Sequence, residues 1–207
     1  LQRYGITETN MNTSNPYDGD RRAGTVGFPL PDVAVRVVGE DGSPLGAGEI
    51  GSIEVSGPNV FGGYWRMPEK TAEEMRPDGF FITGDVGMFD TEGYLTIVGR
   101  SKDLVISGGF NVYPKEVEEA IDALPGVLES AVIGVPHPDF GEGVTAVVVP
   151  RDGADVSEAA VLVALGDQLA RYKQPKRVFV VDELPRNTMG KVQKAALRAR
   201  YEGVFGG

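Results

Sequence analysis

The sequence predicts an α+β protein, in which a region of short strands and hairpins precedes a small domain that mixes strands with helices. Up to residue 99, short apolar runs are separated by turns rich in glycine, proline and asparagine, a pattern typical of antiparallel strands. From residue 100 onward, strand-like runs alternate with stretches in which apolar residues recur at helical spacing. We therefore divide the chain into residues 1–99 and residues 100–207.

The first region has weak signals at its start and stronger ones later. Residues 1–31 are rich in glycine, proline, asparagine and threonine and predict irregular structure. Residues 33–38 and 50–55 predict two strands that pair antiparallel across the turn at residues 40–44. Further strand signals follow in a short apolar segment and in a hairpin, at residues 80–83 and 88–98.

The second region contains helices whose ends are marked by the sequence. One helix begins at Pro114, since proline suits the first helical position, and ends before Gly126. Ser157 predicts the cap of a second helix that runs to about residue 169. The last helix is expected at residues 192–201. Strands are expected around these helices, at residues 104–106, 127–135, 144–149 and 178–181.

Composition narrows the functional classes. The formal net charge of -10 disfavours nucleic-acid binding, because that binding depends on neutralising phosphates with lysine and arginine. The chain has no cysteine, which excludes disulfides, thiolate catalysis and cysteine metal sites. The single histidine, His137, builds neither a metal site nor a catalytic triad alone, and we assign it to a loop. No apolar run approaches the roughly 20 residues that span a bilayer, so we expect no membrane insertion. The absence of cysteine fits the cytoplasmic location that we expect.

Two motifs in the first region combine glycine with hydroxyl or acidic side chains. Residues 4–9 contain Thr7 and Glu8, whose hydroxyl and carboxylate suit phosphate oxygens and Mg²⁺. In residues 83–85, Asp85 follows a glycine at the end of an apolar segment, which is one way to present a carboxylate to a ribose diol. Each motif is also compatible with an ordinary turn, in which these side chains are solvated or cap the chain.

Three further motifs lie at or beyond the boundary between the regions. Arg100, in the charged residues 99–103, suits a phosphate or ribose contact, and the cluster also suits a hinge or an exposed linker. Gly108 and Gly109 allow the backbone to approach a ligand closely, or form a tight hairpin. Lys191 lies on a glycine-containing loop, where it is either a mobile charge for acyl or phosphoryl transfer or a solvated lysine.

The order and spacing of these five motifs resemble the adenylate-forming superfamily, which includes acyl-CoA synthetases, luciferases and peptide-synthetase adenylation domains. The resemblance covers essentially the whole chain. Members of the superfamily have a large N-terminal adenylation domain and a C-terminal lid. They join a carboxylate to ATP, which gives an acyl-adenylate and pyrophosphate. The lid then rotates, and the thiol of CoA attacks the adenylate.

The resemblance implies a domain assignment and a set of roles. Residues 1–99 correspond to the C-terminal part of the adenylation domain and residues 100–207 to the lid, with Lys102 at the hinge. The implied substrates and cofactors are a small-molecule carboxylate, ATP, Mg²⁺ and CoA. The implied nucleotide-site roles are adenine stacking by Tyr4, nucleotide binding by Gly5, phosphate contact by Thr7, Mg²⁺ binding by Glu8, and ribose binding by Asp85 with Arg100 beside it. The implied lid roles are lining of the pantetheine tunnel by Gly108, Gly109 and Phe110, and bridging of the carboxylate and α-phosphate by Lys191.

The chain departs from the family pattern in one respect. The Ser/Thr/Gly-rich phosphate loop does not occur in these residues, and the chain begins without methionine, inside a motif. We expect that loop, most of the acyl pocket and the rest of the N-terminal domain to lie upstream of Leu1. We therefore interpret the chain as a C-terminal fragment with negligible ligase activity of its own.

A narrower resemblance bears on the acid substrate. Several segments resemble malonyl-CoA synthetases, at residues 10–21, 62–70, 136–144 and 186–194. Malonate is therefore the expected acid, and a fatty or aryl acyl-CoA ligase is the alternative within the same class. A non-catalytic, lid-like module that docks a partner is an alternative of another class. Such a module has no need of Glu8, Asp85, Arg100 and Lys191 together, which argues against it.

Overall fold

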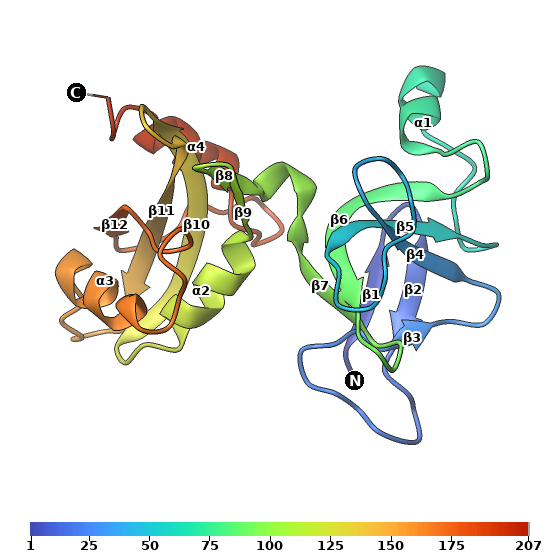
Figure 1. The fold of residues 1–207 in the computed structure, drawn as a ribbon, viewed down its shortest axis with the longest axis horizontal. Coiled ribbons are helices and arrows are strands. Elements are labelled where there is room, and N and C mark those ends of the chain that lie inside the picture. The colour runs from blue at the N-terminus through green and yellow to red at the C-terminus, as the bar shows by residue number, and fades with distance from the viewer. Residues whose placement is uncertain (207) are drawn as a thin grey trace. The chain divides into compact units, whose positions relative to one another are not determined.

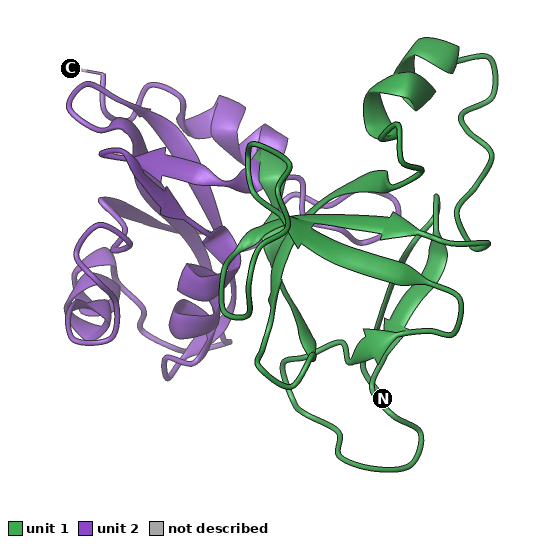
Figure 2. Cartoon of the chain, turned by 45° about the vertical axis from the view of Figure 1, so that its right-hand side comes forward, with its two compact units in different colours: residues 1–102 green, residues 103–207 purple. Residues whose placement is uncertain are grey.

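The computed structural model describes residues 1–206, and the chain separates into two compact units. Unit 1 comprises Leu1–Lys102 and unit 2 comprises Asp103–Gly207, coloured separately in Figure 2. Each unit has clusters of buried hydrophobic side chains made only from its own residues. A separate hydrophobic core is what allows a domain to fold by itself, so each unit meets that requirement.

Unit 1 begins with a small antiparallel sheet of β1 (Arg3–Ile6), β2 (Asn10–Ser14) and β3 (Phe28–Pro29). The prediction of irregular structure for residues 1–31 was therefore wrong. The reason is that inward positions of β2 are polar: Asn12 and Thr13 are fully buried. The Thr13 hydroxyl donates to the Val26 carbonyl at 2.8 Å, which satisfies it inside the protein. Polar inward positions remove the apolar alternation by which a strand is recognised.

A second sheet in unit 1 has the order β4-β5-β6-β7, with every neighbouring pair antiparallel. Its strands are β4 (Ala34–Val38), β5 (Gly51–Ser56), β6 (Phe81–Phe89) and β7 (Leu95–Arg100). The predicted antiparallel pair of residues 33–38 and 50–55 is confirmed, with Val37 opposite Ile53.

The strand β6 was predicted as two separate pieces, and this prediction was wrong. Its glycines interrupt the apolar pattern that would have indicated one strand. Gly84 has a φ of +72°, which favours glycine. At Gly87 a Cβ would lie 2.5 Å from the Thr96 carbonyl oxygen of β7, so this position excludes any side chain.

The short helix α1 (Pro68–Glu74) had no counterpart among the predicted elements. It has only 7 residues and buries none of them. A helix that buries nothing shows no apolar stripe, so helical periodicity does not detect it. Its visible sequence signals are the proline near its start and the Lys70–Glu74 pair one turn apart.

Unit 2 is built on a sheet with the order β10-β11-β8-β9, to which β12 adds by pairing with β11 (Figure 1). The β11–β12 pair is parallel, and the others are antiparallel. The strands are β8 (Val105–Ser107), β9 (Phe110–Val112), β10 (Val127–His137), β11 (Gly141–Pro150) and β12 (Arg177–Val180). The helices are α2 (Pro114–Asp122), α3 (Glu158–Gly166) and α4 (Lys194–Tyr201).

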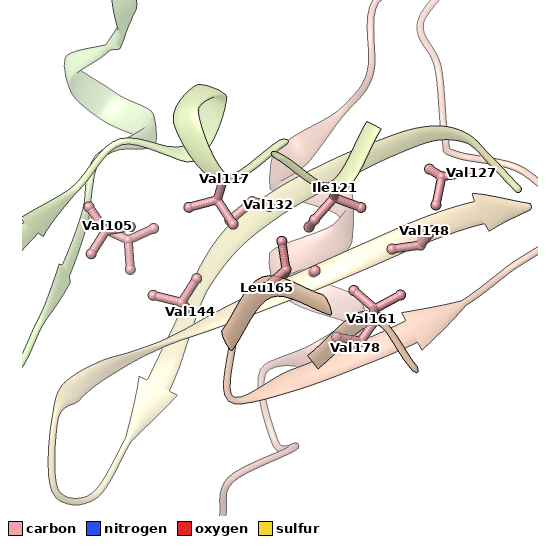
Figure 3. Close-up of a cluster of buried hydrophobic side chains, with 12 residues drawn as sticks. Val105, Val117, Ile121, Val127, Val132, Val144, Val148, Val161, Leu165 and Val178 are labelled. Atoms are coloured by element: carbon pink, nitrogen blue, oxygen red, sulfur yellow. The ribbon is translucent and has the colours of Figure 1, made fainter. Parts of the chain in front are cut away.

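Both faces of the central strands β10 and β11 are covered, which explains their nearly continuous apolar sequence. On one face, Val132, Val144 and Val148 pack with side chains of α2 and α3, and Figure 3 shows these side chains pointing toward one another. On the other face, Ile133 and Val147 pack with Leu197 of α4. Successive residues of a strand point to opposite faces, so the buried residues in these runs reach one core or the other.

Local signals in unit 2 fix several element ends. Pro114 begins α2, as predicted. Ser157 caps α3 by accepting a hydrogen bond from the Ala160 amide at 3.3 Å, although this helix ends at Gly166. The assignment of His137 to a loop was wrong, because it is the last residue of β10 and pairs with Gly141. Its ring packs between Phe140 and Phe205, with centroid separations of 4.8 and 4.7 Å.

None of the helices within residues 1–206 combines the length and the apolar character needed to cross a membrane.

The core of unit 2 gives a stability prediction. Replacing the fully buried Ile121 with alanine is expected to cost roughly 2–5 kcal/mol of unfolding free energy, because it removes apolar contacts and leaves a cavity. Val163→Ala is the matched control, since Val163 is 78% exposed on α3. Urea unfolding of the 207-residue chain, followed through NMR signals of β10 and β11, measures both. Equal losses in the two variants would contradict the proposed packing.

Candidate functional site

Unit 1 contains a cavity of about 540 Å³ that gathers charged groups of both signs. Its walls come from the turn after β1, from the strand β6, from the segment around α1 and from the end of β7. The charged side chains that line it are those of Glu8, Lys70, Glu74, Arg100 and Lys102. Lysine and arginine side chains around one cavity suit an anionic ligand.

Local packing explains why position 5 is a glycine. The register between β1 and β2 shifts between Tyr4 and Gly5, which brings the two strands close together. A Cβ on Gly5 would lie 2.1 Å from the Asn10 carbonyl oxygen, so only glycine fits there. The following turn closes with a hydrogen bond from the Thr9 amide to the Ile6 carbonyl at 3.2 Å.

That turn presents Thr7 and Glu8. The Thr7 side chain is exposed, whereas Glu8 is half-buried and lines the cavity. The backbone of Glu8 is fixed from the other side, because its carbonyl accepts from the Phe61 amide at 2.8 Å. Loop residues held in this way are suited to bind a ligand.

Asp85 is the centre of a buried polar cluster next to the cavity. It is 4% exposed, and its Oδ2 accepts from the Tyr4 hydroxyl at 2.7 Å. The Arg100 Nε lies 3.0 Å from Oδ1 of the same carboxylate, since Asp85 and Arg100 face each other in the β6–β7 register. Burial and the adjacent Asp85 charge raise the pKa of Tyr4, so its hydroxyl stays protonated and donates.

The structure places Tyr4 inside unit 1. Its ring belongs to the hydrophobic core with Ile53 and Leu95, and it is 8% exposed. A carboxylate has about four acceptor positions, so Asp85 retains acceptor capacity after binding Tyr4 and Arg100. The adenine-stacking role of Tyr4 and the ribose-binding role of Asp85 stay predictions.

Sequence reasoning missed a hydroxyl that contacts Glu8. The Tyr64 hydroxyl donates to Glu74 Oε2 at 2.6 Å and lies 3.1 Å from Glu8 Oε1. Lys70 pairs with the other oxygen of Glu74 at 2.6 Å. Hydrogen bonds from Lys70 and then Tyr64 lower the pKa of Glu74, while burial raises the pKa of Tyr64. The only early signal was the one-turn spacing of Lys70 and Glu74.

The residues of the cavity are suited to bind Mg²⁺ only when phosphate groups of a ligand supply further oxygen atoms. Within residues 1–206, no cluster of three or more acidic, histidine or cysteine side chains is placed to hold a metal ion. Mg²⁺ is commonly bound by one or two carboxylates together with substrate phosphates. Glu8 on the cavity wall meets that requirement, and the Glu74 carboxylate lines the same cavity and shares the Tyr64 hydroxyl with Glu8.

The other predicted site residues belong to unit 2. Gly108 and Gly109 form the tip of the β8–β9 hairpin with φ values of +60° and +82°, and their role in lining the pantetheine tunnel stays a prediction. Phe110 follows, 56% exposed, with its ring stacked on Tyr172 at 4.7 Å. Lys191 is exposed on the loop between β12 and α4.

The boundary between the units falls in a short 3-10 helix, η1 (Ser101–Asp103). Lys102 is the last residue of unit 1 and lines the cavity. Among the predicted residues, the structure thus brings Glu8, Arg100 and Lys102 to one cavity, with Asp85 paired to Arg100.

The family model described as AMP-binding enzyme matches residues 1–65, and the one described as AMP-binding enzyme C-terminal domain matches residues 116–191. The chain belongs to the adenylate-forming superfamily. The two matches follow each other in the order that the motifs predicted.

Individual relatives of this superfamily member are similar over nearly all of its length. Indoleacetate–CoA ligase of Aromatoleum aromaticum is 44% identical over 200 residues, which cover 96% of this chain and 39% of the ligase. Long-chain-fatty-acid–CoA ligase of Escherichia coli O157:H7 is 40% identical over 204 residues, 98% of this chain and 36% of the ligase. The crystal structure of ATP-bound MatB from Rhodopseudomonas palustris has a TM-score of 0.94 and 67% identity, covering 98% of this chain and 41% of MatB.

The chain therefore spans between 36% and 41% of the length of these three relatives. The superfamily identification and the mixed α/β fold agree with the sequence predictions. The individual site roles stay predictions.

The Tyr64 cluster gives a testable electrostatic prediction. Tyr64→Phe is expected to raise the pKa of Glu74 toward its ordinary value, because the ionised carboxylate loses one donated hydrogen bond while keeping Lys70. Carbon-detected NMR titration of the glutamate carboxyl groups measures this change. Tyr17→Phe is the control, because Tyr17 is 79% exposed. A Glu74 pKa that is the same in both variants would rule out the hydrogen bond as a cause.

Proposed function

We propose that this chain forms part of an ATP-dependent carboxylate–CoA ligase, which makes an acyl-adenylate and then an acyl-CoA thioester. The observation that supports this most directly is the cavity lined by Glu8, Arg100 and Lys102, next to the buried Asp85. Glu8 lies far along the sequence from Asp85, Arg100 and Lys102, and the family resemblance implies a role for each of the four. Relatives named as CoA ligases, and a relative whose structure contains ATP, add support.

The proposed first step joins the carboxylate to the α-phosphorus of ATP with loss of pyrophosphate. Attack by one anion on another requires positive charge where the negative charge develops. Thr7 contacts a phosphate oxygen, Asp85 binds the ribose with Arg100 beside it, and Tyr4 stacks on the adenine. Mg²⁺, when bound with the nucleotide, neutralises phosphate charge, and Glu8 is the residue that would hold it.

The proposed second step needs a different set of residues at the same place. Lys191 bridges the carboxylate and the α-phosphate in the first step, and Gly108, Gly109 and Phe110 line the path of the pantetheine arm in the second. One group must be present for adenylation and absent for thioester formation, and a lid that moves on a hinge supplies this exchange. We assign unit 2 to the lid and Lys102 to the hinge.

Malonate is the acid that we propose. The segments at residues 10–21, 62–70, 136–144 and 186–194 resemble malonyl-CoA synthetases. Identity to MatB is 67%, against 44% and 40% for the ligases named for indoleacetate and long-chain fatty acids. A fatty or aryl acid is the second candidate, because ligases with those names also match nearly the whole chain. A cytoplasmic location belongs to the same proposal, since ATP and CoA are supplied there.

The reaction can be tested in the longest protein that contains this chain. Pyrophosphate release is measured with ATP, Mg²⁺, CoA and one of malonate, methylmalonate, acetate, octanoate or benzoate. We expect release that depends on malonate and falls roughly 10²–10³-fold in Lys191→Ala, because a charge that stabilises the transition state is lost. Lys115→Ala is the control, since it removes a lysine of α2 that pairs with Glu119 outside the proposed site.

The outcomes separate the candidates. Release with octanoate or benzoate instead of malonate would replace the substrate and keep the reaction. No release with any acid would favour the non-catalytic module that docks a partner. Equal activity in the two lysine variants would remove Lys191 from the proposed mechanism.

The isolated 207-residue chain is expected to form no measurable malonyl-CoA thioester. The reason is that the Ser/Thr/Gly-rich phosphate loop of the family does not occur in its sequence. Thioester formation can be followed by chromatography of CoA products at high protein concentration. Turnover by the isolated chain at a rate comparable to the longer protein would show that its residues suffice.

A further inference from the structure

Backbone hydrogen bonds define the shape of the loop that bears Lys191. The Asn187 amide donates to the Lys191 carbonyl at 2.9 Å, and the Gly190 amide donates to the Asn187 carbonyl at 2.9 Å. Gly190 has a φ of +76°, which lets the chain turn back at this point. The loop is therefore a closed turn rather than an open connection.

The side chain of Asn187 fills this turn. Its Oδ1 accepts from the Met189 amide at 3.0 Å and from the Lys191 amide at 2.9 Å. Asparagine side chains commonly organise turns by bonding to backbone groups two or more residues later. One oxygen atom thus fixes the backbone on which the lysine side chain stands.

Arg186 supports the same loop from its base. Its Nη1 donates to the Gly190 carbonyl at 2.6 Å, and its Nη2 pairs with Glu129 of β10. An isolated bridge joins Arg186 to Val192, and the Gln193 amide donates to the Pro185 carbonyl at 2.8 Å. The arginine therefore connects the loop to the central sheet of unit 2.

The two ends of the loop are anchored in the core, while its tip is exposed. Leu184 is buried and Val192 is packed against the same hydrophobic cluster, together with Leu197 of α4. Met189 is 75% exposed, and Lys191 is exposed as well. The loop backbone is thus anchored at both ends, while the Met189 and Lys191 side chains are exposed.

We propose that Asn187 and Arg186 are positioning residues that hold the Lys191 backbone in the geometry required for adenylation. A long lysine side chain loses considerable conformational entropy when it binds, and a pre-shaped backbone removes part of that cost. Charge stabilisation is also effective only when the charged group is already in place. This inference rests on the proposed function, because it requires that Lys191 acts in adenylation.

The inference predicts a selective effect on the first step of the reaction. Asn187→Ala is expected to slow adenylation roughly 10-fold to 10²-fold, since a small misplacement of a catalytic group costs up to that factor. Asn187→Thr is expected to recover most of the rate, because the threonine hydroxyl also accepts hydrogen bonds from backbone amides. The recovery is expected to be incomplete, because these hydrogen bonds are weaker than those of asparagine. Thioester formation from supplied malonyl-adenylate is expected to keep its wild-type rate in both variants.

The experiment uses the longest protein that contains this chain. ATP–pyrophosphate exchange with malonate reports adenylation, and CoA consumption from malonyl-adenylate reports the second step. The variants are Asn187→Ala, Asn187→Thr, Arg186→Ala, Lys191→Ala and the double variant Asn187→Ala/Lys191→Ala. We expect the double variant to be no slower than Lys191→Ala, because Asn187 acts through the lysine.

A second measurement needs no activity. In the 207-residue chain, hydrogen exchange of the Met189 and Lys191 amides is expected to be at least tenfold faster in Asn187→Ala, while amides of β10 and β11 exchange as before. Unchanged exchange at both loop amides would overturn the proposal, because the loop would hold its shape without Asn187.

The kinetic experiment distinguishes failure of the proposed Lys191 role from failure of the positioning role alone. If Lys191→Ala adenylates normally, the proposed role of Lys191 fails and the positioning role fails with it. If Lys191→Ala is defective but Asn187→Ala is normal, only the positioning role fails. Equal slowing of both steps by Asn187→Ala, or additive losses in the double variant, would mean a general structural effect and would also overturn the inference.

Discussion

Unit 1 depends on a buried negative charge. The Asp85 carboxylate lies on β6, and it is bound by Tyr4 of β1 and by Arg100 of β7, so three strands from two sheets meet at one group. A buried ion that loses its partner typically costs about 3–5 kcal/mol. The arrangement is therefore strongly constrained, and it fixes Arg100 at the edge of the cavity where Lys102 and Glu8 also lie.

Unit 2 is stabilised mainly by hydrophobic packing on both faces of its sheet. Its sheet is covered on both faces, by α2 and α3 on one side and by α4 on the other, so its core does not need unit 1. That independence is what the proposed lid requires, because a domain that changes position must stay folded while it does so. The Lys191 loop projects from this rigid support between β12 and α4.

Sequence patterns predicted those parts of the fold that are determined locally. The apolar runs of β10 and β11 and the proline at the start of α2 indicated their elements directly. The strands β1 and β2 escaped prediction because polar groups such as those of Asn12 are buried there, and β6 because glycines interrupt it. For the site, motif order selected Glu8, Arg100 and Lys102, whose roles stay predictions. Tyr64 was missed because it contacts Glu8 across 56 residues, a relation that depends on the folded path of the chain.

The surroundings of two aromatic rings give each unit its own spectroscopic label. The chain has one tryptophan and one histidine. Trp65 lies in unit 1 with 84% of its surface exposed, so its fluorescence emission responds to whatever covers the segment before α1. His137 lies in unit 2 between Phe140 and Phe205, so ring currents shift its imidazole resonances while the C-terminal residues remain docked. Fluorescence and proton NMR can therefore follow the two units separately in the unmodified protein, without a mutation or an attached dye.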